Sequence, residues 1–282
     1  MNIGVALKPG ITEAWSTVEL LARWAANKNI KIWTEVRSKP YLHEQVSFAS
    51  RAEMALKCDL IIVLGGDGTM LSVAREIERN IPVLGVNFGR LGYLTEFPVE
   101  ELLPTLERFL IGDYCLDRRM RLQAELVRHN STAATYCVLN DVVVNKAALA
   151  RMIELECRID DKLVNHFRAD GLIVSTPTGS TAYSLSAGGP IIHPAINAVV
   201  ITPICPHTLT NRPIVADSNL TIELLLLSPS DEVTLTLDGQ MGIPLQAGDR
   251  IRVTKSKNYF NLLRPANKNF FDILREKLNW GR

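Results

Sequence analysis

Three features that often assign a protein to a class are scarce in this sequence: paired cysteines, clustered histidines and runs of like charge. Its five cysteines are scattered, odd in number and never in Cys-x-x-Cys spacing, which argues against a disulfide framework and against a zinc site. The five histidines are isolated as well, so metal ligation by protein side chains has little support. The net charge is +1 without a long run of like charge, which gives no general attraction to nucleic acid or anionic membranes.

Long apolar runs are also missing, and none approaches the roughly 18–20 residues of a membrane span. Met1 to Lys8 alternates as a strand does, unlike a signal peptide with its charged segment and apolar core. With 282 residues, 47% hydrophobic and 22% charged, the chain suits one large or two medium globular domains. We therefore expect a soluble cytoplasmic protein without nucleic-acid or membrane partners.

The most informative stretch runs from Asp59 to Leu71. Its apolar part, Leu60 to Leu64, predicts a strand buried on both faces, and Gly65-Gly66-Asp67-Gly68-Thr69 follows before a helical pattern begins at Met70. Glycines let a charged ligand approach the backbone, and amides at a helix start favour anions, so this turn is typical of a phosphate site. The sequence matches neither the P-loop nor the three-glycine dinucleotide fingerprint.

Asp67 is electrostatically unfavourable inside an anion-binding turn, and three interpretations stay open. It could bind a divalent metal that bridges phosphates, or it could accept a proton from an attacking hydroxyl group. Alternatively, this is a plain strand-to-helix turn in which Asp67 caps the helix. In the phosphate-binding interpretation, Thr69 can cap the helix.

The first part of the chain alternates between the two kinds of element. Strands are expected at Ile3–Leu7, Ile30–Val36, Leu60–Leu64 and Pro82–Val86, and helices at Thr12–Asn27, Ser47–Lys57, Leu71–Arg79 and Val99–Ile111. Such alternation predicts a Rossmann-like α/β domain with a parallel sheet, whose ligands bind at the carboxyl ends of the strands. A second glycine segment, Asn87–Leu94, should lie on that same edge. There Tyr93 or Phe88 could stack on a base, unless the segment is an ordinary turn.

Past about Asp117 the pattern becomes that of an antiparallel β domain. Strands are expected at Leu122–Val127, Tyr136–Val144, Ile153–Ile159, Lys162–Phe167, Gly171–Ser175, Val199–Ile204, Leu220–Leu226, Val233–Leu237 and Arg250–Thr254. Helical patterns return near Ser180–Ala187 and at Phe270–Trp280. We expect an α/β domain over 1–117, a β domain over 118–265, and a helical tail over 266–282 that packs back on the first domain.

The β domain contains a second distinctive segment, Ala169 to Pro190. Seven serine and threonine residues lie between Ser175 and Ser186, together with Tyr183 and several glycines. So many hydroxyl groups are unfavourable in a plain core and suit ribose hydroxyls and phosphate oxygens, although a purely structural Ser/Thr turn is the alternative.

These segments together resemble the bacterial NAD kinase family over essentially the whole chain. The resemblance rests on Gly65–Thr69, Asn87–Leu94, Leu139-Asn140-Asp141, Asp170–Pro190 and Leu237-Asp238-Gly239-Gln240. The first motif alone also resembles those of diacylglycerol-type lipid kinases and, more loosely, phosphofructokinases, but the combination in this order is specific.

The resemblance implies transfer of the terminal phosphoryl group of ATP to the 2′-hydroxyl of the adenosine ribose of NAD. It also implies a divalent metal (Mg²⁺ with ATP), the two small-molecule substrates NAD and ATP, and a homotetramer. Two rival functions share part of the pattern. A lipid kinase would need an apolar acceptor channel, and a non-catalytic dinucleotide sensor would not need Asp67.

Carried over by position, Asp67 is the proton acceptor, and the other motif residues bind the dinucleotide. These are Gly68, Asn140, Asp141, Arg151, Arg168, Asp170, Thr181, Ala182, Tyr183, Ser184, Leu185, Ser186 and Gln240. Arg151 occupies a variable position of the family, and Asp141 stands where many members have glutamate.

Overall fold

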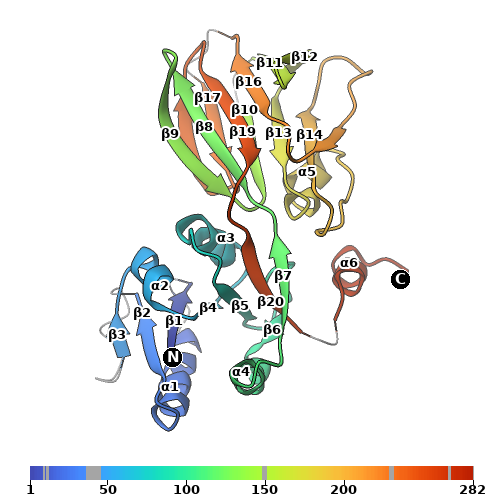
Figure 1. The fold of residues 1–282 in the computed structure, drawn as a ribbon. Helices are drawn as coiled ribbons and strands as arrows, with labels where there is room; N and C mark the ends of the chain where they lie inside the picture. The colour runs from blue at the N-terminus through green and yellow to red at the C-terminus, as the bar shows by residue number, and fades with distance from the viewer. Residues whose placement is uncertain are drawn as a thin grey trace. The chain divides into compact units, whose positions relative to one another are not determined.

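The computed structural model describes residues 1–8, 10, 13–35, 46–147, 151–228, 232–265 and 268–281. They form two compact units, Met1–Arg118 with Phe260–Arg282, and Arg119–Tyr259 (Figure 1). The sequence analysis expected these boundaries at 117/118 and 265/266. The expected ends of one helix at Thr12 and of one strand at Val36 lie outside the described residues.

The first unit is built on a sheet with the strand order β3-β2-β1-β4-β5-β20-β7, and β6 pairs with β5. The printed pairs from β3 through β20 are all parallel, as the strand–helix alternation predicts. The strands are β1 (Asn2–Leu7), β2 (Lys31–Thr34), β3 (Val46–Phe48), β4 (Leu60–Leu64), β5 (Pro82–Asn87), β6 (Phe97–Pro98), β7 (Cys115–Arg119) and β20 (Phe260–Arg264).

Helices pack against this sheet and bury both faces of β4. The helices of the first unit are α1 (Glu13–Ala26), α2 (Arg51–Lys57), α3 (Asp67–Glu76), α4 (Leu102–Leu110, after a 3-10 turn at Val99–Glu101) and α6 (Phe270–Leu278). Ile62 belongs to the apolar cluster that α1 and α4 share with the sheet. Met70 of α3 packs closely on Gly85 of β5, because a Cβ there would lie 2.4 Å from the Met70 methyl group.

The helix expected over Ser47–Lys57 begins only at Arg51, because Val46–Phe48 forms β3 and pairs with β2. The strand β20 is not among the expected elements. It lies parallel to β5, with Leu262 opposite Val83. Arg264 at its end donates to both carboxylate oxygens of the buried Glu96, at 2.7 and 3.1 Å, and lies 3.5 Å from Asp117. A segment from the end of the chain thus completes the first sheet.

The second unit contains two antiparallel sheets, with the strand orders β15-β14-β13-β10-β17-β18 and β12-β11-β16-β19-β8-β9. Their strands are β8 (Leu122–Arg128), β9 (Ser131–Val138), β10 (Asp141–Lys146), β11 (Ile153–Ile159), β12 (Lys162–Ala169), β13 (Gly171–Ser175), β14 (Ala198–Ile204), β15 (Ile214–Asp217), β16 (Ile222–Leu226), β17 (Val233–Leu237), β18 (Met241–Leu245) and β19 (Arg250–Lys255). Between β13 and β14 lie a 3-10 turn (Gly179–Thr181) and a short helix, α5 (Tyr183–Ser186).

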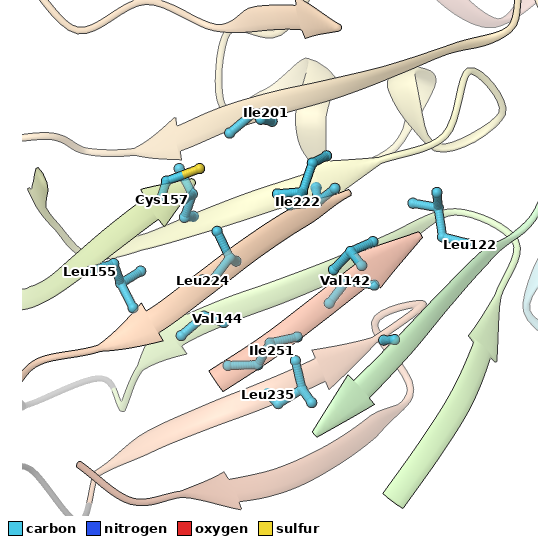
Figure 2. Packing of buried hydrophobic residues seen from close by; sticks show 14 of the residues in the cluster. Leu122, Val142, Val144, Leu155, Cys157, Ile201, Ile222, Leu224, Leu235 and Ile251 are labelled. Carbon is cyan, nitrogen blue, oxygen red and sulfur yellow. The ribbon is translucent and has the colours of Figure 1, made fainter. Parts of the chain in front are cut away.

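Side chains from both sheets form one buried apolar cluster. Figure 2 shows Val142 and Leu235 of one sheet and Leu224 and Ile251 of the other within this layer. The predicted antiparallel β fold and the predicted parallel α/β fold are both confirmed. Among the helices that the structure describes, none has the length and apolar composition needed to span a bilayer.

Candidate active site

The glycine turn lies at the carboxyl end of β4, where α3 begins directly (Figure 1). A Cβ on Gly65 would lie 2.6 Å from Thr69 Oγ1, so packing requires a glycine at that position. Gly66 has an ordinary φ of −95°, and a Cβ there would meet no atom within 4 Å. The open side of the turn is therefore at Gly66. The helix begins at Asp67 with Gly66 as the N-cap and without a side-chain cap, so neither Asp67 nor Thr69 is its N-cap residue.

Asp67 joins the glycine turn to the second glycine segment. Its Oδ2 accepts a hydrogen bond from the Tyr93 amide at 2.8 Å. Its Oδ1 accepts from the Leu94 amide at 3.0 Å and from the Thr95 amide and hydroxyl, both at 3.2 Å. A Cβ on Gly92 would lie 2.0 Å from Oδ1, so the close approach requires glycine there. Hydrogen bonds from backbone amides thus stabilise the negative charge of Asp67, which the sequence analysis considered unfavourable in this turn.

The second glycine segment separates its two aromatic candidates. Phe88 packs against the apolar cluster of the first unit, whereas Tyr93 is half-buried beside Asp67. The Lys277 ammonium of α6 lies 5.7 Å from the centre of the Tyr93 ring, within the range of a cation–π contact. Of these two aromatic residues, Tyr93 is the one that lies beside Asp67, and its backbone amide donates to the Asp67 carboxylate.

A cavity of about 710 Å³ opens beside the glycine turn. Its lining residues are Lys8, Glu35, Ala49, Ser50, Arg51, Glu53, Gly66, Gly68, Thr69, Ser72 and Glu76. This position agrees with the expectation that ligands of a parallel sheet bind at the carboxyl ends of its strands.

In the second unit, the Asn140-Asp141 motif lies where the chain passes from β9 in one sheet to β10 in the other. The single strand expected over Tyr136–Val144 is therefore two strands. The buried Asp238 carboxylate accepts hydrogen bonds from the amides of Leu139 (3.1 Å), Asn140 (2.7 Å) and Asp141 (3.3 Å). These contacts satisfy the amides that the break in the strand leaves without a ladder partner.

Asp238 is a positioning residue that the sequence analysis matched to a motif without giving it a role. It sits with φ of 49° in the loop between β17 and β18, followed by Gly239 with φ of 63°. An Asp-Gly pair between two strands is a signal for a tight hairpin turn. The Asp-Gly pair predicts the turn, but it does not predict which distant backbone amides donate to the Asp238 carboxylate.

Four of the expected dinucleotide-binding residues meet at one cavity of about 300 Å³. Asn140, Asp141, Ala182 and Tyr183 line it, together with Val143, Asn145, Thr236, Asp238 and Gly239. Tyr183 is 46% exposed, whereas Asp141 is only 3% exposed. Burial, followed by the nearby Asp238 carboxylate, raises the pKa of Asp141 from 3.8 to about 7.

The hydroxyl-rich segment folds around the Asn140 turn. Thr176 donates its hydroxyl to the Leu139 carbonyl at 2.6 Å, and a Cβ on Gly179 would lie 2.1 Å from the Asn140 carbonyl oxygen. Ser180 and Ser184 are also buried and bond within the unit. The hydroxyl groups of Thr176, Ser180 and Ser184 thus help to shape the loop.

The other expected residues are placed elsewhere in the described structure. Arg151, Arg168 and Gln240 are exposed, and Asp170 lies 3.5 Å from Lys146. Leu185 and Ser186 belong to α5, and Thr181 ends the 3-10 turn before it. The lining of the 300 Å³ cavity does not include these three residues or Arg151, Arg168, Asp170 and Gln240. Gly68 lines the larger cavity of the first unit, and Ser184 is buried.

Asp141 is expected to make the free energy of unfolding depend on pH. Its pKa in the folded protein lies above the value of 3.8 for an exposed carboxyl, so its stabilising contribution is complete below that value and is lost as the pH rises through about 7. Relative to Asp141→Asn, the unchanged protein should lose about 2–3 kcal/mol between roughly pH 5 and pH 8. Urea unfolding at both pH values measures this, with Asp161→Asn in an exposed turn as the control. Equal pH dependence in all three proteins would contradict the assignment.

Within the described residues, no group of three or more histidine, cysteine, aspartate or glutamate side chains is arranged to hold a metal ion. Magnesium commonly binds through substrate phosphates and one or two carboxylates rather than through an all-protein cage.

A glycine turn at the edge of a parallel sheet, in one chain with a β unit that has a carboxylate-lined cavity, is the arrangement expected of a nucleotide-dependent phosphotransferase. Comparison with known proteins makes this specific. Residues 3–114 match the family model of the ATP-NAD kinase N-terminal domain, and residues 139–265 match that of the C-terminal domain. The chain belongs to the ATP-NAD kinase family. It is an ATP-dependent phosphotransferase that acts on NAD.

Individual relatives agree with this assignment. The chain is 48% identical to an NAD kinase of Geotalea daltonii over 267 residues, which cover 93% of both chains. A crystal structure of an NAD kinase from Archaeoglobus fulgidus in complex with ATP matches with a TM-score of 0.78 and 25% identity, covering 99% of both chains. A yeast NADH kinase complexed with NADH has the same fold, with a TM-score of 0.92 at 24% identity over 100% of this chain and 88% of the yeast chain.

Proposed function

We propose that this enzyme transfers the terminal phosphoryl group of ATP to the 2′-hydroxyl of the adenosine ribose of NAD, with Asp67 as the proton acceptor. The observation that carries the proposal is the Asp67 carboxylate at the open glycine turn. Among the described residues, Oδ1 accepts three hydrogen bonds, whereas Oδ2 accepts one, from the Tyr93 amide. A carboxylate oxygen has two lone pairs, so Oδ2 keeps one for the attacking hydroxyl group.

The remaining residues bind and orient the substrates in this proposal. Gly66 offers open backbone to the phosphates of ATP beside the 710 Å³ cavity. Asn140, Asp141, Ala182 and Tyr183 bind the dinucleotide at the 300 Å³ cavity. Other family-matched residues complete this binding set: Gly68, Arg151, Arg168, Asp170, Thr181, Ser184, Leu185, Ser186 and Gln240. Phosphoryl transfer requires mostly such positioning, together with neutralisation of charge.

The proposal includes the metal, the assembly and the location. Mg²⁺ bound with ATP would offset the negative charge of its phosphates. The active form is a homotetramer, as the family resemblance implies. We place it in the cytoplasm, where thiols stay reduced, and all five cysteines of the chain are indeed unpaired.

The test is formation of NADP from NAD, ATP and Mg²⁺ by the purified protein, measured with an NADP-specific dehydrogenase. We expect NADP to accumulate only when all three are present. NAD binding without NADP formation would favour a dinucleotide sensor instead. Phosphorylation of lipid micelles without use of NAD would favour a lipid kinase, and either result would overturn the proposal.

A further inference from the structure

The 710 Å³ cavity of the first unit has two cationic side chains in its lining, Lys8 and Arg51, and they differ in their surroundings. Arg51 is already engaged: its Nε donates to Glu35 at 2.6 Å, and its Nη1 donates to Ser72 at 2.6 Å and to Glu76 at 3.0 Å. Its charge is therefore offset by two carboxylates, and its side chain is only 12% exposed.

Lys8 is in the opposite situation. It is exposed, and its ammonium group makes no hydrogen bond or ion pair with the residues that the structure describes. Its backbone is nevertheless held firmly at the end of β1, where the Lys8 amide donates to the Leu64 carbonyl at 3.0 Å. The lysine charge thus lies at a hydrogen-bonded strand end, and no anion of the described residues is paired with it.

The stem of Lys8 lies directly beside the glycine turn. A Cβ built on Gly65 would lie 3.0 Å from Lys8 Cβ, so the two backbones are in close contact. The next residue of the turn, Gly66, faces open space in the same cavity. An anion bound against the Gly66 backbone is within reach of the Lys8 side chain, because Lys8 packs against the neighbouring Gly65.

The acidic side chains that line the cavity each have another partner among the described residues, and none of them pairs with Lys8. Glu35 and Glu76 accept from Arg51. Glu53 accepts from the amide and hydroxyl of Ser50 in the capping box of α2. Among the described residues that line the cavity, Lys8 is thus the cationic side chain that stays available to an anionic ligand.

We propose that Lys8 is the residue that binds and neutralises the phosphate groups of the phosphoryl donor at the glycine turn. This inference rests on the proposed function only in naming the donor as ATP. The ligand group that Lys8 would bind is the triphosphate of the donor. The compact ammonium ion of lysine acts on phosphate oxygens as a point charge.

The test compares Lys8→Met and Lys8→Arg with Lys257→Met, which removes the same charge at an exposed site that does not line the cavity. Isothermal titration calorimetry measures the dissociation constants for ATP, inorganic triphosphate and adenosine. We expect Lys8→Met to weaken ATP and triphosphate by about 10- to 100-fold and to leave adenosine and NAD unchanged. Lys8→Arg should keep the affinity within about threefold, since the charge is retained.

A second readout is the ionic strength dependence of ATP affinity, which should become weaker in Lys8→Met than in the other proteins. Equal triphosphate affinity in Lys8→Met and Lys257→Met would overturn the inference, as would a parallel loss of adenosine binding, which indicates a damaged cavity. If the unchanged protein forms no NADP, the proposed function fails, but the triphosphate titrations still decide the role of Lys8.

Discussion

Replacing Asp67 by asparagine is expected to lower the turnover number for NADP formation by about 100-fold or more, with a smaller effect on NAD affinity. Asparagine keeps one acceptor oxygen for Leu94 and Thr95. The NH2 group that replaces Oδ2 can neither take up a proton nor accept the hydrogen bond of the Tyr93 amide. The loss of that single hydrogen bond should lower the free energy of unfolding by about 1–3 kcal/mol. Steady-state kinetics, NAD titration and urea unfolding measure the three effects separately.

A control is needed because Asp67 has a visible structural role in joining two glycine segments. Thr95→Val removes only the hydroxyl that donates to Oδ1 at 3.2 Å and keeps the backbone amide. It should lower the free energy of unfolding by about 1 kcal/mol and leave turnover within about threefold. Near-normal turnover in Asp67→Asn would exclude the role as proton acceptor. Equal losses of turnover in both variants would assign Asp67 to loop positioning alone.

Replacing Asp238 by glycine is expected to produce the largest loss of stability, about 3 kcal/mol or more. Glycine accepts the positive φ of 49° without strain, so the effect reports the carboxylate itself. Without that group, the amides of Leu139, Asn140 and Asp141 lose their acceptor. The Asn140-Asp141 turn should then loosen, and NAD affinity should fall by about 10-fold or more.

Asp161→Gly is a matched control for this change. Asp161 also has a positive φ, 63°, in a hairpin turn of the same unit, and it is exposed. Its carboxylate accepts no hydrogen bond from the described residues, so the free energy of unfolding should change by no more than about 0.5 kcal/mol. If the two glycine variants unfold at the same urea concentration and bind NAD equally, Asp238 does not position the turn.

Much of the first unit could be predicted from the sequence, because its signals are local. The apolar run Leu60–Leu64 and the glycines after it specify a buried strand and a tight turn over a few residues, and both are present as expected. The strand–helix alternation likewise predicted the parallel sheet. The sequence also predicted that the two glycine segments lie on one edge, and the hydrogen bonds of Asp67 to Tyr93 and Leu94 confirm it.

Predictions failed where the deciding partner is distant in the chain. The apolar run Tyr136–Val144 looks like one strand locally, but the Asp238 carboxylate, about 100 residues later, holds the break between β9 and β10. The strand β20 was missed for the same reason, because Phe260–Arg264 is a short segment whose strand character comes from pairing with β5. The hydroxyl groups of Thr176 and Ser180 gave a clear signal, but their partners were visible only in the fold.

The sequence alone therefore determined the two fold types, the glycine turn and the motif set that assigns the family, since each depends on residue type and short-range spacing. Which polar side chains already have hydrogen-bond or ion-pair partners, and which stay available to a ligand, became visible only in the folded structure. Asp67 and Arg51 are bound by neighbours, Asp141 is buried beside Asp238, and Lys8 has no partner among the described residues. Hydrogen bonding and burial are properties of neighbours in space, and the chain brings those neighbours together only when it folds.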